Sequence, residues 1–224
     1  AGPGVAALAP AAGPGVAAPI GIGALIGTAA SQLTARRSRK QQPRGARSVA
    51  TRAQSEVSEI DFRVGKIVSC KNHPDSDKLL VEEIDVGEGE PRTICSGIAN
   101  FFSPDQVEGR MCVIVANLKE RKIGGVPSNG MLLCASTRDG EELSALDIVT
   151  PPADAKVGER VAIEDPEGET GDAAPPNRVQ KKKLYEKVAP HLKTNADGQV
   201  QYKDVSFNTS AGPCTATLSS AVVS

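Results

Sequence analysis

The sequence contains few aromatic residues and few histidines. Its 224 residues include no Trp, aromatic content is 3%, and His73 and His191 are the two histidines. Two histidines provide few ligands for a zinc site of His and Cys, so no such site is expected. The five cysteines form no CxxC pair: Cys70, Cys95, Cys112, Cys134 and Cys214. Thiols in apolar runs behave as small hydrophobes, which favours a reduced compartment.

The first 55 residues contain no Asp or Glu. Residues 1–35 have no charged side chain and include eleven glycines and prolines. Seven cations follow: Arg36, Arg37, Arg39, Lys40, Arg44, Arg47 and Arg52. A segment rich in Arg and Ser and free of acids is typical of an organelle transit peptide. We therefore expect residues 1–55 to be a disordered transit peptide and the protein to be organellar, with a chloroplast favoured over a mitochondrion.

A long apolar run is also missing. Residues 20–33, IGIGALIGTAASQL, are uncharged, so a membrane anchor is the alternative interpretation of the N-terminal segment. The apolar part is short for a bilayer, and Gly21, Gly23 and Gly27 interrupt it. The transit peptide is therefore preferred, and no membrane association is expected.

The remaining residues are globular in composition and acidic. Hydrophobic residues make up 39% of the sequence and charged residues 24%, which fits one or two domains. Of the 26 Lys and Arg residues, seven precede residue 56. The other 19, together with all 27 Asp and Glu residues, give residues 56–224 a formal charge of −8. Strong nonspecific nucleic-acid binders tend to be basic, which argues against broad electrostatic binding.

Short apolar runs separated by turn residues begin near residue 59. They predict five strands: 62–70, 78–86, 92–97, 110–118 and 130–136. A further extended piece is expected at 157–163. The segment SPDQVEG (103–109) offers an N-cap Ser, a Pro in the first turn and a terminal Gly, which predicts a short helix. The pattern indicates a mainly β fold, with a five-stranded OB-fold barrel over residues 58–163.

Residues 164–224 are expected to form a linker and a small α+β module. The segment 164–177 is acidic and rich in Gly and Pro, which is typical of a linker. Helical spacing over 178–192 places four apolar residues near one face: Val179, Leu184, Val188 and Leu192. These elements are too short to bury a core alone, so we expect them to pack on the barrel.

The motifs of this chain resemble those of the tRNA-binding domain family. The elements are HPDSDKL (73–79), CSG (95–97), NLK (117–119) and SNGM (128–131), and their joint occurrence is more specific than any one. The tail resembles the C-terminal module of the endothelial monocyte-activating polypeptide II-like subgroup. Over residues 58–220 the resemblance implies an OB barrel that binds tRNA by shape, near the outer corner of the molecule. It also implies a monomer, with an aminoacyl-tRNA synthetase as a candidate partner.

The segment NLKERKIGGVPSNGMLLCAS (117–136) holds the first candidate site residues. OB barrels bind nucleic acid on their middle strands and the adjoining loops. There Lys119, Arg121 and Lys122 would reach phosphates and release counterions. The alternative is that these cations only solvate a hairpin tip. The resemblance favours RNA binding over that alternative.

Further candidates lie on either side of this segment. Lys66 and Lys78 would extend a basic track along the strands. Asn100 is expected either to contact RNA or to cap the following helix. Ser128 can hydrogen-bond its own turn, and Asn129 offers a donor and an acceptor to a sugar or base edge.

Two residue types are given structural roles instead. Met131 is expected to fill a gap in the core rather than to contact RNA, and His73 to pack in its turn beside Pro74. A basic run lies on the predicted C-terminal helix: Arg178, Lys181, Lys182 and Lys183. These residues are expected either to make secondary contacts to phosphate or simply to form a solvated helix face.

The sequence gives no support for catalysis or for a cofactor. No His or Cys lies near Ser128 in sequence, and Asp75 and Asp77 lack a third catalytic element. There is no ATP-binding signature either. Scarce aromatics argue against base stacking as the main source of affinity, so recognition of folded tRNA by backbone and shape is favoured. The alternative function is an organellar protein-interaction module that keeps the barrel without strong RNA binding, as the acidic balance suggests.

Overall fold

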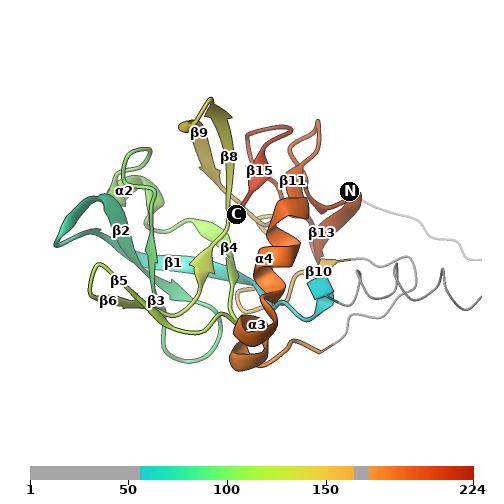
Figure 1. The fold of residues 1–224 in the computed structure, drawn as a ribbon, viewed down its shortest axis with the longest axis horizontal. Helices are drawn as coiled ribbons and strands as arrows, with labels where there is room; N and C mark the ends of the chain where they lie inside the picture. The colour runs from blue at the N-terminus through green and yellow to red at the C-terminus, as the bar shows by residue number, and fades with distance from the viewer. Residues whose placement is uncertain (1–55, 164–171) are drawn as a thin grey trace, which may run out of the picture. The chain divides into compact units, whose positions relative to one another are not determined.

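The computed structural model describes residues 56–163 and 172–224 and is mainly β, as the sequence predicts (Figure 1). The predicted transit peptide at 1–55 and residues 164–171 of the predicted linker lie outside the described residues. Within the two described ranges, no helix is long and apolar enough to cross a membrane.

The first sheet contains five antiparallel strands in the order β3-β2-β1-β4-β7. Their bounds are β1 (Phe62–His73), β2 (Ser76–Asp85), β3 (Arg92–Ser96), β4 (Met111–Val115) and β7 (Met131–Leu132). The most apolar strand, β4, is interior, as its sequence predicts. Its side chains are buried on both faces, because Val113 and Val115 join one hydrophobic cluster and Cys112 and Ile114 join another.

A short helix, α2 (Pro104–Val107), connects β3 to β4. Ser103 is its N-cap, and the Ser103 backbone N–H donates to Gln106 Oε1 at 2.9 Å. Gly109 adopts a φ of 82° just after the helix, a conformation that glycine adopts readily. The helix predicted from SPDQVEG is therefore confirmed, with its cap at Ser103.

The second sheet joins the middle of the chain to its C-terminal segment. Its strands are β8 (Cys134–Asp139), β9 (Glu142–Ile148), β10 (Ala162–Ile163), β11 (Leu192–Thr194), β12 (Val200–Tyr202), β13 (Val205–Thr209), β14 (Gly212–Pro213) and β15 (Val222–Val223). They follow the order β10-β13-β12-β11-β15-β8-β9, with β14 paired to β13. Strand β15 thus lies between β11 and β8, and Ser224 exchanges two backbone hydrogen bonds of 2.9 Å with Cys134.

A third, two-stranded sheet consists of β5 (Arg121–Ile123) and β6 (Val126–Ser128). It forms a hairpin whose tip is Gly124–Gly125, both with positive φ. Glycine at both central positions permits the tight two-residue turn that such a hairpin needs.

The C-terminal segment contains α3 (Pro176–Lys182), α4 (Leu184–Val188) and the 3-10 turn η1 (Ala189–His191). The single helix predicted over 178–192 is wrong in its continuity, because Lys183 adopts a left-handed conformation with φ 51° and separates α3 from α4. The predicted apolar face is nevertheless buried: Val179, Leu184, Val188 and Leu192.

Three other predictions differ from the structure. The single strand predicted at 130–136 is divided into β7 of the first sheet and β8 of the second. The extended piece predicted at 157–163 is a strand only at 162–163, because Gly158 turns the backbone at φ 83°. The β9 strand was not predicted, although the pair Asp139–Gly140 is a typical hairpin turn signal. Closure of five strands into an OB-type barrel stays a prediction.

The C-terminal segment shares a hydrophobic core with the first half of the fold. Phe62 of β1 and Phe207 of β13 pack edge to face, with ring centroids 4.8 Å apart. Asp147 of β9 accepts hydrogen bonds of 2.8 Å from both the backbone N–H and the hydroxyl of Thr217. Buried apolar side chains and hydrogen bonds therefore hold the C-terminal segment against the preceding part of the fold.

One carboxyl group is fully buried in the first sheet. Glu82 of β2 has no exposed surface, and one carboxyl oxygen is hydrogen-bonded by the Ser96 hydroxyl. Its Oε2 atom has no hydrogen-bond partner among the described residues. Burial raises the pKa of Glu82 to about 8, against the opposing effect of Ser96. The folded protein therefore holds this side chain protonated at neutral pH.

This pKa makes stability depend on pH. The unfolded chain ionises Glu82 near its ordinary pKa while the folded chain keeps the proton. The free energy of unfolding therefore falls as pH rises from about 5 to about 8, by up to about 1.4 kcal/mol per pH unit. Urea unfolding at several pH values should show this decline in the wild type and a flatter profile in Glu82→Gln. Exposed Glu90→Gln is the matched control; equal slopes in the wild type and Glu82→Gln would contradict this assignment.

Candidate functional site

The β5–β6 hairpin is anchored at its tip by a buried histidine. His73, only 5% exposed, lies with its Nε2 atom 3.2 Å from the carbonyl oxygen of Ile123. Its Nδ1 atom accepts a hydrogen bond of 3.0 Å from the Asp75 backbone N–H. The ring also packs under Gly124, where an added Cβ would lie 2.5 Å from His73 Cε1. His73 therefore packs in its turn, as predicted, and holds the hairpin tip.

The base of the hairpin is fixed by Ser128. Its hydroxyl accepts a hydrogen bond of 3.1 Å from the Cys95 backbone N–H and donates to the Gly130 carbonyl at 3.2 Å. The backbone N–H of Asn129 donates to the Thr93 carbonyl at 2.8 Å. Ser128 is buried and occupied within the protein, whereas no hydrogen bond of the Asn129 side chain occurs among the described residues. Their predicted RNA contacts stay predictions.

The β5–β6 hairpin and the loop before it expose the three predicted cations to solvent. Lys119, Arg121 and Lys122 are all exposed. None of the three belongs to an ion pair within the described part of the chain, so their charges are available to a ligand. Glu120, also exposed, lies between them in sequence and offsets one of these charges.

The predicted secondary cations divide into two groups. Arg178 of α3 binds Glu59, with its Nη2 atom 2.9 Å from Oε1, and this hydrogen bond lowers the pKa of Glu59. Lys181, Lys182 and Lys183 are exposed. Arg178 therefore fastens α3 to the start of the fold, while the three lysines remain candidates for phosphate contact.

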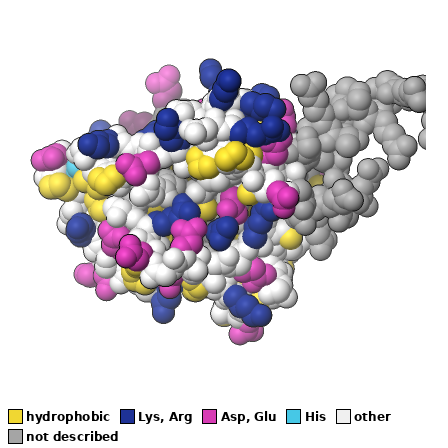
Figure 2. Space-filling model, turned by 90° about the horizontal axis from the view of Figure 1, so that it is seen from below, with side chains coloured by type: hydrophobic (Ala, Val, Ile, Leu, Met, Phe, Trp, Pro, Cys, Tyr) yellow, Lys and Arg dark blue, Asp and Glu magenta, His cyan; other side chains and the backbone are white. Residues whose placement is uncertain are grey.

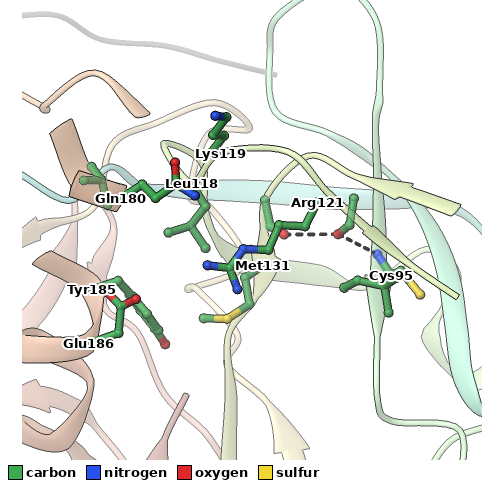
Figure 3. Close-up of a pocket in the computed structure, with 12 residues that line it drawn as sticks. Cys95, Leu118, Lys119, Arg121, Met131, Gln180, Tyr185 and Glu186 are labelled. Carbon is green, nitrogen blue, oxygen red and sulfur yellow. Dashed lines mark hydrogen bonds between the residues drawn. The ribbon is translucent and has the colours of Figure 1, made fainter. Parts of the chain in front are cut away.

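A cavity of about 160 Å³ brings the hairpin and the C-terminal helices together. Its lining residues come from both parts of the chain: Cys95, Leu118, Lys119, Arg121, Ile123, Ser128, Gly130, Met131, Val179, Gln180, Tyr185 and Glu186. Figure 3 shows the guanidinium of Arg121 extending past Met131 toward the helix that carries Tyr185 and Glu186. Lys119 and Arg121, but not Lys122, thus border the same cavity as α3. Local sequence patterns did not predict this arrangement. Met131 packs partly buried against the core, as predicted, and its remaining surface lines the cavity.

Asn117, the first residue of the NLK element, holds the two sides of this cavity in place. Its Oδ1 accepts from the Asp61 backbone N–H, and its Nδ2 donates to the carbonyls of Glu59 and Ala174, each at 2.9 Å. The NLK motif by itself gives Asn117 no role. Its apolar neighbours were a signal, because a buried amide needs hydrogen-bond partners from elsewhere in the fold.

The other candidates lie outside the cavity lining. Lys78 and Asn100 are exposed and close together, since the Ala99 backbone N–H lies 3.4 Å from the Lys78 carbonyl. Lys66 is exposed on β1, opposite Asp85 of β2. The alternative role of Asn100 as a helix cap is wrong, because Ser103 occupies that position.

The charged surface is mixed. Figure 2 shows the face that carries α3: Lys and Arg side chains gather along its upper margin beside an apolar patch. Over the rest of that face, acidic and basic side chains alternate. Any electrostatic attraction of an anionic ligand is therefore local to the margin rather than spread over the face.

Comparison with known proteins assigns the family. Residues 62–160 match the family model described as "Putative tRNA binding domain". The crystal structure of the C-terminal domain of Plasmodium vivax p43 superposes with a TM-score of 0.68 at 28% identity, covering 75% of this chain and 98% of that one. These matches define a tRNA-binding type of β domain. Over residues 62–160 the chain belongs to the tRNA-binding domain family.

Curated relatives are longer proteins. The chain is 41% identical over 175 residues to the cytoplasmic methionine–tRNA ligase of Arabidopsis thaliana, covering 78% of this chain and 20% of the ligase. It is 44% identical over 157 residues to the cytoplasmic tyrosine–tRNA ligase of Gallus gallus, covering 69% and 28%. It is 40% identical over 152 residues to aminoacyl tRNA synthase complex-interacting multifunctional protein 1 of Cricetulus griseus, covering 68% and 40%. The chain thus spans less than half of each relative.

The His73–Gly124 contact predicts unequal effects of two neighbouring substitutions. Alanine at Gly124 (φ 57°) and at Gly125 (φ 88°) faces similar backbone strain, of about 1 kcal/mol. A Cβ at Gly124 also meets His73, whereas a Cβ at Gly125 meets nothing within 4 Å. Chemical denaturation should therefore show Gly124→Ala losing at least about 1 kcal/mol more stability than Gly125→Ala. Equal losses would show that the tip is not anchored by His73.

Proposed function

We propose that this protein is a noncatalytic tRNA-binding protein that recognises folded tRNA by backbone and shape through an OB-type barrel. The observation that carries the proposal is the position of Lys119, Arg121 and Lys122. They lie inside the family match, are exposed, and sit on a loop and hairpin fixed at both ends. Cations on a fixed frame lose little conformational entropy when they meet phosphates.

The relatives support the choice of partners. Several are named as tRNA ligases and one as a protein that interacts with a synthetase complex. On this basis tRNA is the ligand and an aminoacyl-tRNA synthetase is the second partner. A monomer is supported by β15, which pairs with β8 and covers that strand edge with the chain's own C-terminus.

An organellar location, with a chloroplast favoured, belongs to the same proposal. It is supported by the absence of acids and the seven cations of residues 1–55. Catalysis has no part in the proposal. Separately, among the described residues no group of three His, Cys, Asp or Glu could hold a metal ion.

The acidic balance favours one second candidate, an organellar protein-interaction module that retains the barrel without strong RNA binding. Residues 56–224 carry 19 cations against 27 acids, and Arg178 and Lys187 form ion pairs with Glu59 and Glu56. This candidate predicts that replacing Lys119, Arg121 and Lys122 with Glu abolishes capture of a protein partner and leaves RNA association unchanged.

Charge reversal tests the first proposal. The triple variant Lys119→Glu, Arg121→Glu, Lys122→Glu should lower tRNA affinity at low salt by at least about 30-fold. It should also reduce the slope of log K against log salt by about 2, because each lost phosphate contact removes about 0.7 to 0.9. Gel-shift titration over a salt series measures both quantities.

The matched control reverses three exposed cations that do not line the cavity, Arg138, Lys156 and Lys193. It has the same change in net charge, so any difference reports the location of the binding surface. Equal weakening of both triple variants, or no salt-dependent binding by the wild type, would contradict the proposal.

A further inference from the structure

The cavity between the hairpin and the C-terminal helices has the chemistry of a site for one flat polar ligand. Its walls are apolar, formed by Leu118, Met131 and the ring of Tyr185. Its polar side chains include the guanidinium of Arg121, the ammonium of Lys119, the carboxylate of Glu186 and the amide of Gln180. A small number of polar groups on apolar walls is the usual composition of a ligand pocket.

The charged groups of the cavity are not used by the protein itself. Among the ion pairs of the described residues, none involves Arg121 or Glu186, although both line the same cavity. The picture agrees, because Arg121 reaches across the opening from the hairpin side while Glu186 comes from the helix side (Figure 3). A ligand that carries a negative group at one end and a hydrogen-bond donor at the other would complement both.

The orientation of the helix side is fixed by the break at Lys183. The left-handed Lys183 redirects the chain between α3 and α4, and Leu184 and Val188 anchor α4 in the core. Tyr185 and Glu186 are then placed at the cavity. Burial raises the pKa of the Tyr185 phenol, so the tyrosine remains neutral there.

The size of the cavity limits the ligand. Its volume of about 160 Å³ is close to the cavity of about 150 Å³ that accepts a benzene-sized molecule. A six-membered ring therefore fits. Free phosphate would leave the apolar walls unused and meet the Glu186 carboxylate, and an apolar side chain would desolvate Arg121 and Glu186 without compensation.

From these features we propose that the cavity binds a single unstacked nucleobase of the bound RNA, one that carries an exocyclic amino group. The proposal rests on the proposed tRNA-binding function and adds to it the reading of one base. The base lies between Tyr185 and Met131, its amino group donates to Glu186, and its phosphate meets Arg121 and Lys119. Adenine, cytosine and guanine each carry such an amino group on a six-membered ring, whereas uracil has none. The volume of about 160 Å³ matches the single ring of cytosine best.

The two methionines of the chain provide a direct readout. Met131 lines the cavity, and Met111 lies at the start of β4 outside the lining, so it serves as an internal reference. In the full chain labelled with ¹³C-methyl methionine, Met131→Leu assigns the two NMR signals. Titration with AMP and CMP should shift the Met131 signal at millimolar concentration and leave the Met111 signal in place.

Other ligands and one variant with its control decide the identity of the ligand. UMP should bind at least about fivefold more weakly than CMP, the low end of what one hydrogen-bonded base edge contributes, and ribose 5-phosphate should leave Met131 unchanged. Glu186→Gln should abolish the preference for CMP over UMP, whereas exposed Glu142→Gln on β9 should retain it. Equal shifts by ribose 5-phosphate, or a larger shift by N-acetyl-leucinamide, would overturn the base assignment.

The outcome is separable from that of the proposed function. Salt-dependent tRNA binding without any nucleotide effect on Met131 would overturn the base pocket and leave tRNA binding standing. Absence of tRNA binding by the wild type would overturn the proposed function, and the inference that rests on it.

Discussion

The architecture of the candidate site depends on the side chain of one buried asparagine. Asn117 connects the start of β1, the end of β4 and the segment that leads into α3, through three hydrogen bonds of 2.9 Å. Loss of the amide would remove the hydrogen bonds of the Asp61 N–H and the Ala174 carbonyl, at a cost of about 1–3 kcal/mol for each buried group left unpaired. The Glu59 carbonyl would still accept a hydrogen bond of 2.8 Å from the Ala174 backbone N–H. The adjoining Leu118 and Lys119 are thereby placed on one side of the cavity and α3 on the other.

A second feature of the candidate site is the distribution of charged side chains around it. The folded residues are acidic overall, yet two acids beside α3 pair with cations that have structural roles, Glu59 with Arg178 and Glu56 with Lys187. Glu120 and Glu186 belong to no ion pair among the described residues. These pairs are partly exposed and contribute little to stability individually. Their effect is to neutralise two carboxylates beside α3, so that of the three cations Lys119, Arg121 and Lys122 only one is offset, by Glu120. An acidic protein can in this way keep a local basic surface.

Much of the fold could be predicted from local sequence. Alternation and turn residues identified the strands of the first sheet, Ser103 and Pro104 marked α2, and helical spacing identified the buried face that contains Val179 and Val188. These features depend on neighbours within a few residues, where periodicity and capping apply directly. The helix break at Lys183 carries no such signal, because lysine rarely adopts a positive φ.

The cavity could not be predicted for a related reason. It forms where residues 118–131 meet residues 179–186, and that meeting depends on long-range contacts such as Asn117 with Ala174, 57 positions apart. The hairpin cations were found because charge clusters are local, and the family motif favoured binding over solvation. Glu186 and Tyr185 were missed because neither stands out in a lysine-rich helical segment.

The central claim is that the hairpin and the C-terminal helices form one RNA-binding surface. Hydrogen–deuterium exchange of the full chain, with and without tRNA, tests it directly. The account predicts simultaneous protection of residues 117–131 and 176–187, with none at the β8–β9 turn around 138–142. Protection of only one of the two segments, or of the β8–β9 turn instead, would contradict it.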